Sequence, residues 1–193
     1  MGSSAHTPRQ DRTASAILEA AARVLAADGI GASMADVAEA AGVGRTTLYR
    51  YFPTREALLE ALAAEAVADA GARLAAAGLN HVATAVAIER IVRALLSTGE
   101  RYAVLLQEPI APHAADVERL IANPIRSVFE RGVREGAIRS DLTTEILVDL
   151  FGGLLREAIQ IVKHGRLGIE DAAKMTTTLF LEGAELPAAT REP

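Results

Sequence analysis

Cysteine and tryptophan are absent from this chain of 193 residues, and only two of its 20 basic residues are lysine. Without cysteine, the chain can form no disulfide bond, no thiol redox sensor and no thiolate site for a metal ion. No apolar run approaches the roughly 18 residues of a membrane-spanning helix, and the first residues are too polar for a signal peptide. These absences predict a cytoplasmic protein that does not enter a membrane.

Aromatic residues make up only 4% of the chain, whereas 50% of the residues are hydrophobic and 23% are charged. This balance is typical of a globular protein, and the length allows about 70% of the unfolded surface to be buried. Alanine, leucine and charged residues dominate, and no segment alternates between apolar and polar residues, so we expect an all-α fold. The net charge of −5 disfavours nucleic-acid binding over the whole surface but permits one local basic face.

Known catalytic motifs are missing from the sequence. It has no GxSxG nucleophile elbow, no HExxH motif, no glycine loop followed by Lys-Ser/Thr and no dinucleotide fingerprint. The four histidines lie far apart in the sequence, without the paired spacing of metal ligands. They are His6, His81, His113 and His164. We therefore expect no catalytic site, no metal and no cofactor.

Residues 33–55, SMADVAEAAGVGRTTLYRYFPTR, have the pattern of two short helices joined by a tight turn. Ser33 and Asp36 have the spacing of a capping box, which satisfies free N–H groups at the start of a helix. The glycines of Gly42-Val43-Gly44 can adopt the positive φ that ends the first helix, and the second helix then begins near Arg45. This arrangement predicts a helix-turn-helix.

The outward face of the second helix is basic and polar. Leu48 and Phe52 lie four residues apart on its inward edge, and the twelve residues from Gly44 to Arg55 include three arginines and no acidic residue. Arginine can read guanine edges, threonine can contact bases, and tyrosine hydroxyls can bind phosphates. A solvated helical hairpin is the alternative, but we predict a DNA-binding face. Its candidate residues are Ser33, Arg45, Thr46, Thr47, Tyr49, Arg50, Tyr51 and Arg55.

The segment MADVAEAAGVGRTTLYRYFPTREALLEAL closely resembles the N-terminal domain of TetR-type transcriptional repressors, and the resemblance covers about residues 10–62. Its most specific part is TLYRYF, followed by a basic residue and EALL. The family usually has lysine at the position of Arg55, and either cation can hold a phosphate. The resemblance implies a dimeric regulator that binds a double-stranded DNA operator, with a C-terminal pocket for a small-molecule effector.

We expect the first helix, about residues 11–28, to pack across the helix-turn-helix and complete a three-helix domain. A long alanine-rich helix follows, from about 54 to 78, and the domain boundary should fall inside it without a flexible linker. The predicted regions are a disordered arm (1–10), the DNA-binding domain (11–60), a helical effector-binding and dimerisation domain (61–186) and a tail (187–193).

The C-terminal part contains Asn123-Pro124 within an otherwise helical pattern. Either Pro124 kinks one helix, or Asn123 caps a new helix with proline in its first turn. We favour the kink. The helices expected in this part span about 80–97, 99–107, 114–135, 142–163 and 169–185.

Apolar residues cover nearly half the circumference of the helix predicted at 142–163, more than the stripe of about 100° that a helix at a monomer surface needs. The surplus suggests that this helix packs on its own core and on a partner chain, and Gly152-Gly153 would allow close approach. TetR-like proteins also dimerise through such a four-helix interface, and a large monomeric core is the alternative. The candidate interface residues are Val148, Gly152, Leu155, Ile159, Ala172, Thr176, Leu179 and Phe180.

The effector pocket is implied by the resemblance and by no motif. Only four aromatic residues follow the predicted helix-turn-helix in the sequence. We therefore expect a mostly aliphatic pocket rather than an aromatic cage for a cation. The candidate lining residues are Thr84, Ile88, Ile91, Tyr102, Gln107, Arg126, Phe129 and Phe151.

The sequence is therefore compatible with three functions. The first, and our prediction, is a dimeric repressor that a small-molecule effector releases from its operator. The second is a DNA-binding regulator without an effector. The third is a helical enzyme or interaction module, which the acid-free helix face and the missing catalytic motifs disfavour.

Overall fold

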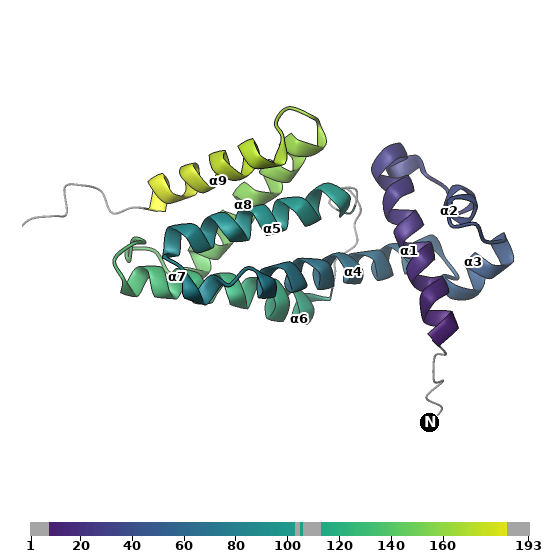
Figure 1. The fold of residues 1–193 in the computed structure, drawn as a ribbon, viewed down its shortest axis with the longest axis horizontal. Coiled ribbons are helices and arrows are strands. Elements are labelled where there is room, and N and C mark those ends of the chain that lie inside the picture. Colours follow the sequence, from purple (N-terminus) through teal and green to yellow (C-terminus); the bar gives the residue numbers. More distant parts are fainter. Residues whose placement is uncertain (1–7, 103–104, 106–112, 185–193) are drawn as a thin grey trace, which may run out of the picture. The chain divides into compact units, whose positions relative to one another are not determined.

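The computed structural model describes residues 8–102, 105 and 113–184, and the regular structure within these ranges is helical, without strands. The all-α prediction is confirmed. A π-helical turn, η4 (Glu118–Ala122), separates α6 from α7, and 3-10 turns η1 (Gly29–Gly31) and η2 (Leu79–His81) follow α1 and α4. The α-helices are α1 (Pro8–Asp28), α2 (Met34–Ala40), α3 (Arg45–Tyr51), α4 (Arg55–Ala76), α5 (Thr84–Tyr102), α6 (Ala114–Val117), α7 (Asn123–Arg134), α8 (Thr144–Lys163) and α9 (Ile169–Ala184) (Figure 1).

Contacts between residues group the chain into two units. The first contains residues 1–66 and 101–112, and the second contains residues 67–100 and 113–193. The division falls inside α4, the long helix in which the sequence places the domain boundary. The limits of 11–60 and 61–186 remain a prediction.

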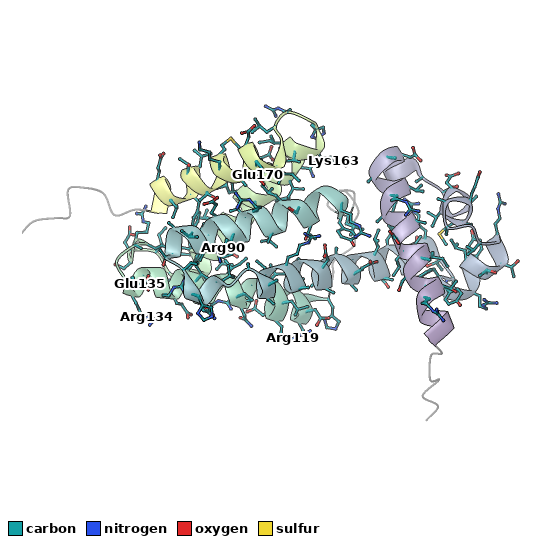
Figure 2. The ribbon with its side chains drawn as sticks, in the orientation of Figure 1. Arg90, Arg119, Arg134, Glu135, Lys163 and Glu170 are labelled. Atoms are coloured by element: carbon teal, nitrogen blue, oxygen red, sulfur yellow. The ribbon has the colours of Figure 1, made fainter. Side chains whose placement is uncertain are left out.

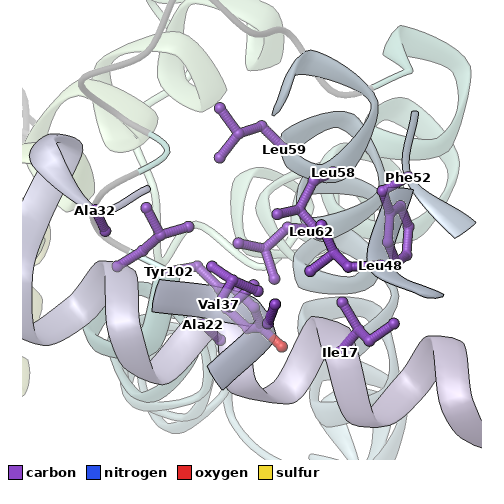
Figure 3. Close-up of a cluster of buried hydrophobic side chains, with 13 residues drawn as sticks. Ile17, Ala22, Ala32, Val37, Leu48, Phe52, Leu58, Leu59, Leu62 and Tyr102 are labelled. Atoms are coloured by element: carbon purple, nitrogen blue, oxygen red, sulfur yellow. The ribbon is translucent and has the colours of Figure 1, made fainter. Parts of the chain in front are cut away.

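One apolar core holds the first unit together (Figure 3). Ile17 and Leu25, which recur at helical spacing on α1, are both buried in it. Val37 of α2, Leu48 of α3 and Leu62 of α4 are buried in the same core. Burial of apolar side chains removes their surface from water, which is the main favourable term in folding. The core thereby fixes one side of α3 and leaves its opposite side facing outward.

Three phenylalanines form a closed cluster in the second unit, one each from α7, α8 and α9. The ring centroid of Phe129 lies 5.4 Å from that of Phe151 and 5.1 Å from that of Phe180. The rings of Phe151 and Phe180 are 4.9 Å apart, and both contacts of Phe151 have the edge-to-face geometry that aromatic pairs favour. The cluster joins three helices that are far apart in the sequence.

Helix α5 runs without interruption from Thr84 to Tyr102, so the break predicted between residues 97 and 99 is wrong. Gly99 lies within this helix, and a Cβ atom at this position would come within 2.5 Å of Ile159 on α8. The glycine therefore permits close packing of two helices and does not end one. Only residues up to 102, with 105, belong to the described part of the expected 99–107 segment.

The chain around Pro124 stays helical. Asn123 has helical dihedral angles (φ −62°, ψ −45°), so it does not cap a new helix there. The π-helical turn η4 lies directly before Asn123. Such a widened turn often occurs where a regular helical hydrogen bond cannot form, as at the N-terminal side of a proline.

Two arginines hold the connection between α4 and α5. Arg90 of α5 (labelled in Figure 2) donates a hydrogen bond of 2.8 Å from Nη1 to the carbonyl oxygen of Ala77. Arg131 of α7 donates from Nη2 to the carbonyl oxygens of Leu79 and Val82, at 3.0 and 3.2 Å. These bonds satisfy backbone acceptors that the end of a helix leaves free.

Candidate nucleic-acid interface

The capping box predicted at the start of α2 is present. The Ser33 N–H donates to Oδ2 of Asp36 at 2.8 Å, and the Asp36 N–H donates to Oγ of Ser33 at 3.3 Å. The Ser33 hydroxyl also donates to Oδ2 of Asp36 at 2.7 Å. The backbone and side-chain hydrogen bonds from Ser33 lower the pKa of Asp36 from its usual value, since both favour the carboxylate. Asp36 is therefore charged at neutral pH, where it stabilises the positive end of α2.

The turn between α2 and α3 has the geometry that its glycines predict. Gly42 has φ +66°, and its N–H donates to the carbonyl oxygen of Glu39 at 3.0 Å. Val43 then donates to the carbonyl oxygen of Ala38 at 3.0 Å, which closes the end of α2. Gly44 has extended dihedral angles and precedes the first residue of α3, Arg45, as predicted.

Helix α3 has one buried edge and one exposed face. Leu48 and Phe52 are buried, in agreement with their predicted inward positions. The guanidinium carbon of Arg50 lies 5.3 Å from the centre of the Tyr51 ring, which is half-buried, as is Thr47. The exposed candidates on this helix are Arg45, Thr46, Tyr49 and Arg50. A cationic, hydrogen-bonding surface of this kind can contact both phosphates and base edges.

Two of the eight DNA-binding candidates form side-chain hydrogen bonds within the chain. The hydroxyl of Ser33 forms the capping box. Arg55 is half-buried and donates a hydrogen bond from Nη1 to the carbonyl oxygen of Ala32. These residues are 23 positions apart, and no local sequence pattern signals such a pair.

The described candidate effector residues lie in different parts of the structure. Tyr102 packs in the core of the first unit, whereas Phe129 and Phe151 belong to the aromatic cluster of the second. Arg126 forms an ion pair of 2.7 Å with Glu118, and this partner raises the arginine's pKa. Gln107 lies outside the described residues.

The remaining three candidates are buried side chains of α5. Ile88 and Ile91 are completely buried. Thr84 is also buried, and its hydroxyl donates to Oε2 of Glu135 at 2.9 Å. These three residues are part of the packed interior of the second unit. Three of the four aromatic residues that follow the helix-turn-helix form the phenylalanine cluster, and the mostly aliphatic pocket remains a prediction.

A groove of about 380 Å³ lies between α5 and α9, and none of the eight candidates lines it. Arg93 crosses it, donating to Glu170 at 3.0 Å and to Glu89 at 3.0 Å; Figure 2 labels Glu170. The hydrogen bonds that Arg93 donates to Glu170 and Glu89 raise the pKa of the arginine. The groove is lined by Glu89, Arg93, Glu170, Asp171, Lys174, Thr177 and Thr178.

Most of the candidate interface residues are buried within their own unit, and their part in a dimer contact remains a prediction. Leu155 and Ile159 are buried on α8, and Ala172, Thr176 and Phe180 are buried on α9. Val148 and Gly152 are half-buried. Leu179 is 53% exposed and is the candidate most available to a partner.

The apolar residues that α8 exposes are different ones. Leu150 is 59% exposed and Ile146 is 45% exposed, one helical turn apart. Gly153 lies one turn further on, with no atom within 4 Å of the place where a Cβ would be. Since α8 is apolar on two sides, its sequence alone does not distinguish the side that faces the core. The exposed residues Ile146, Leu150 and Leu179, together with Gly153, are called the α8–α9 patch below.

The described helices include none with the length and apolar character that crossing a bilayer requires. Among the described side chains, no three histidines or carboxylates come together as a possible metal site.

Comparison with known proteins finds a family model that matches the segment around the helix-turn-helix. Residues 17–62 match the family model described as "Bacterial regulatory proteins, tetR family". The chain is similar to the HTH-type transcriptional regulator NfxB of Pseudomonas aeruginosa, with 27% identity over 162 residues, which cover 81% of this chain and 87% of the relative. It is 39% identical over 100 residues to the HTH-type transcriptional repressor LfrR of Mycolicibacterium smegmatis, covering 52% of each protein.

The structure is also similar to a solved one, the TetR-like transcriptional regulator LfrR from Mycobacterium smegmatis in complex with proflavine. The TM-score is 0.75, with 28% sequence identity over 91% of this chain and 99% of the other. The likeness extends well beyond the helix-turn-helix, into the second unit.

Proposed function

Since this chain is a TetR-family transcriptional regulator with a helix-turn-helix DNA-binding domain, we propose that it represses transcription as a homodimer on a palindromic operator and is released by a small-molecule effector. One observation carries the DNA-binding part. The exposed face of α3 presents Arg45, Thr46, Tyr49 and Arg50 without an acidic neighbour from Gly44 to Arg55, in a chain whose net charge is −5. Its relatives are transcriptional regulators, and binding rather than catalysis is the activity we assign to it.

The recognition step follows from the position of α3. Residues at the N-terminal end of a recognition helix reach base edges most directly, and Arg45 is the first residue of α3. Its guanidinium can bond O6 and N7 of one guanine, while Thr46 contacts a neighbouring base. Tyr49 and Arg50 are suited to phosphate contacts that set the position of the helix on the duplex.

Dimerisation would bring two helix-turn-helix domains to one operator. TetR-family regulators bind operators as dimers, and the α8–α9 patch supplies an apolar surface for such a contact. Two α8 and two α9 helices would bury this patch, and Gly152 and Gly153 would let the backbones approach. Two-fold symmetry then requires half-sites about 34–36 Å apart, or a multiple of that distance.

An effector site in the second unit is supported by buried polar atoms. Within the described part of the chain, the hydroxyls of Thr176 and Thr177 are buried without a hydrogen-bond partner. Such atoms carry a desolvation cost that a ligand could relieve. The similar structure of LfrR contains proflavine, and we propose a small aromatic compound as the effector of this chain.

Titration of a fluorescently labelled duplex tests the DNA-binding proposal. We expect operator affinity above that for a random duplex of equal length, and affinity for both duplexes that falls with salt. Equal affinity for all duplexes would contradict sequence reading, and no binding would favour the enzyme or interaction module. Proflavine binding should be measured without DNA, because planar cations also bind duplexes. If neither proflavine nor other planar aromatic compounds bind, the regulator acts without such an effector.

Substitution of Arg45 by alanine should relax sequence preference at one base position in each half-site. A bidentate arginine–guanine contact discriminates by about 1–3 kcal/mol, and that discrimination would be lost. The melting temperature should hardly change, because the side chain is exposed. Binding-site selection with the wild type and the variant measures the preference. Arg23→Ala, which removes an exposed arginine from α1, is the matched control.

Recovery of the same consensus with the same stringency from Arg45→Ala would contradict this role. The reading function would then belong to Thr46, Thr47 and Arg50.

A further inference from the structure

The groove between α5 and α9 lies within the second unit and is lined by charged residues and threonines. Three of its seven lining residues carry carboxylates, two are cations and two are threonines. Its volume of about 380 Å³ is large enough for a small molecule. No aromatic residue belongs to its described lining, so the groove differs in chemistry from a site for the aromatic effector proposed above.

Ion pairs between the two helices form one wall of the groove. Arg93 of α5 donates from Nε to both carboxylate oxygens of Glu170 at 3.2 Å. Its Nη2 donates at 3.0 Å to Oε2 of Glu170 and at 3.0 Å to Oε1 of Glu89. The three charges, two negative and one positive, sum to −1. Both glutamates therefore already have a cationic partner, and the bridge joins α5 to α9.

Two opposite charges on α9 line the same groove without such a partner. Asp171 and Lys174 are exposed and three positions apart, a spacing at which ion pairs form on helices. Within residues 8–102, 105 and 113–184, neither side chain forms an ion pair or a hydrogen bond. A rise of about 1.5 Å per residue places them about 4.5 Å apart along the helix axis. The groove thus offers one free carboxylate and one free ammonium on neighbouring turns.

A buried hydroxyl lies one turn after Lys174 in the lining of the groove. Thr177 is 8% exposed, and its Oγ1 has no hydrogen-bond partner in the described part of the chain. A helical threonine often bonds the carbonyl oxygen one turn earlier, and this hydroxyl does not. A buried hydroxyl without a partner is costly, so an acceptor on a ligand would be favourable here. Thr178, exposed beside it, adds a second hydroxyl to the lining.

These groups limit the chemistry of a ligand. A simple anion would face three carboxylates against two cations, and a simple amine would leave Lys174 unpaired and be repelled by it. A molecule with both groups can place its ammonium at Asp171 and its carboxylate at Lys174. The same carboxylate can accept a charge-assisted hydrogen bond from the Thr177 hydroxyl. Free amino acids carry the two groups one carbon apart, within reach of side chains on neighbouring helical turns.

We propose that the α5–α9 groove binds a free amino acid, with the ammonium at Asp171 and the carboxylate at Lys174 and Thr177. The Arg93 bridge sets the spacing of α5 and α9 at this site. The inference goes beyond the proposed function. It does not depend on operator binding, because every lining residue belongs to the second unit.

Calorimetric titration of the full-length wild type without DNA tests the ligand class. The probes are the standard L-amino acids and, for the one that binds most tightly, its two analogues that lack the carboxylate or the ammonium. For L-serine these analogues are ethanolamine and 3-hydroxypropionate. We expect at least one amino acid to bind with a Kd of about 1 mM or tighter, and both of its analogues to bind at least about tenfold more weakly.

Three variants test the placement of the ligand. Asp171→Asn and Lys174→Met should each weaken binding about tenfold, because each loses one charge-assisted contact. Thr177→Val should weaken it about threefold without lowering the melting temperature of the free protein, since the hydroxyl has no partner there. Asp28→Asn, at an exposed aspartate of α1, and Lys163→Met, at the only other lysine, are the matched controls and should keep wild-type affinity.

The proposal is overturned if no amino acid binds at millimolar concentration. An analogue that binds as tightly as its amino acid would show a site for a simple amine or a simple anion and would also overturn it. Wild-type affinity in both Asp171→Asn and Lys174→Met would place the ligand elsewhere in the chain. Since none of these titrations contains DNA, failure of the proposed operator binding leaves their outcome unaffected.

Discussion

Replacing Leu150 by glutamate should convert the proposed dimer into a folded monomer and weaken operator binding by about 10²–10⁴-fold, the usual gain from linking two binding modules. Leu150 lies on α8 and is 59% exposed within the chain, so the fold does not depend on it. In the proposed dimer the α8–α9 patch would be buried, and the substitution would bury one glutamate from each subunit in the contact. Burial of unpaired charges is strongly unfavourable.

Light scattering and operator titration would measure both effects. Val86→Glu is the matched control, because Val86 is another apolar residue, 40% exposed, on α5 outside the patch. It should remain dimeric. Leu155→Glu is a poor substitute for Leu150→Glu, because Leu155 is only 9% exposed and its loss would damage the core of its own unit. A wild type that is monomeric at micromolar concentration, or a Leu150→Glu variant that remains dimeric, would contradict this interface.

Truncation of Leu48 to alanine should destabilise the first unit by about 2–5 kcal/mol and abolish most operator binding. Leu48 is fully buried in the apolar core and holds α3 against it. Its loss leaves a cavity beneath the reading helix, so stability and affinity fall together. Arg45→Ala should instead change base preference without a comparable loss of stability.

Hydrogen exchange of the α3 amides is the appropriate measurement, because a chain of two units need not unfold in one step. Leu48→Met, which conserves volume, should cost less than about 1.5 kcal/mol and serves as the control. Unchanged protection of α3 in Leu48→Ala would show that the leucine does not hold the reading helix.

The helix-turn-helix could be predicted because its determinants are local. Ser33 and Asp36 are three residues apart, and their capping box forms within one helical turn. Gly42 adopts the positive φ that the turn requires, and Leu48 lies on the buried edge of α3. Each of these features depends on residues within a few positions of one another, and single-sequence reasoning detects such features well.

The features that the sequence did not reveal involve residues far apart in the chain. The Arg55–Ala32 bond spans 23 positions, and the phenylalanine cluster joins three helices. Gly99 has the usual pattern of a helix end, yet it is retained within α5 because Ile159 packs against it. In each case tertiary packing outweighs local preference.

The orientation of α8 shows the same limit. Both Leu150 and Leu155 belong to apolar stripes, but the first is exposed and the second is buried. Periodicity identifies the stripes, and only the positions of α7 and α9 determine which stripe faces the core. Leu150 is therefore more accessible to a partner than Leu155, on the helix that is predicted to carry the contact.

Binding-site selection from a random duplex pool with the full-length wild type tests dimeric operator recognition most directly. An inverted repeat should be enriched, with half-sites separated by one helical turn of about 10–10.5 base pairs or a multiple of it, and with a guanine positioned for Arg45 in each half. A pool that shows no enriched sequence, or a consensus consisting of one unrepeated half-site, would contradict the account.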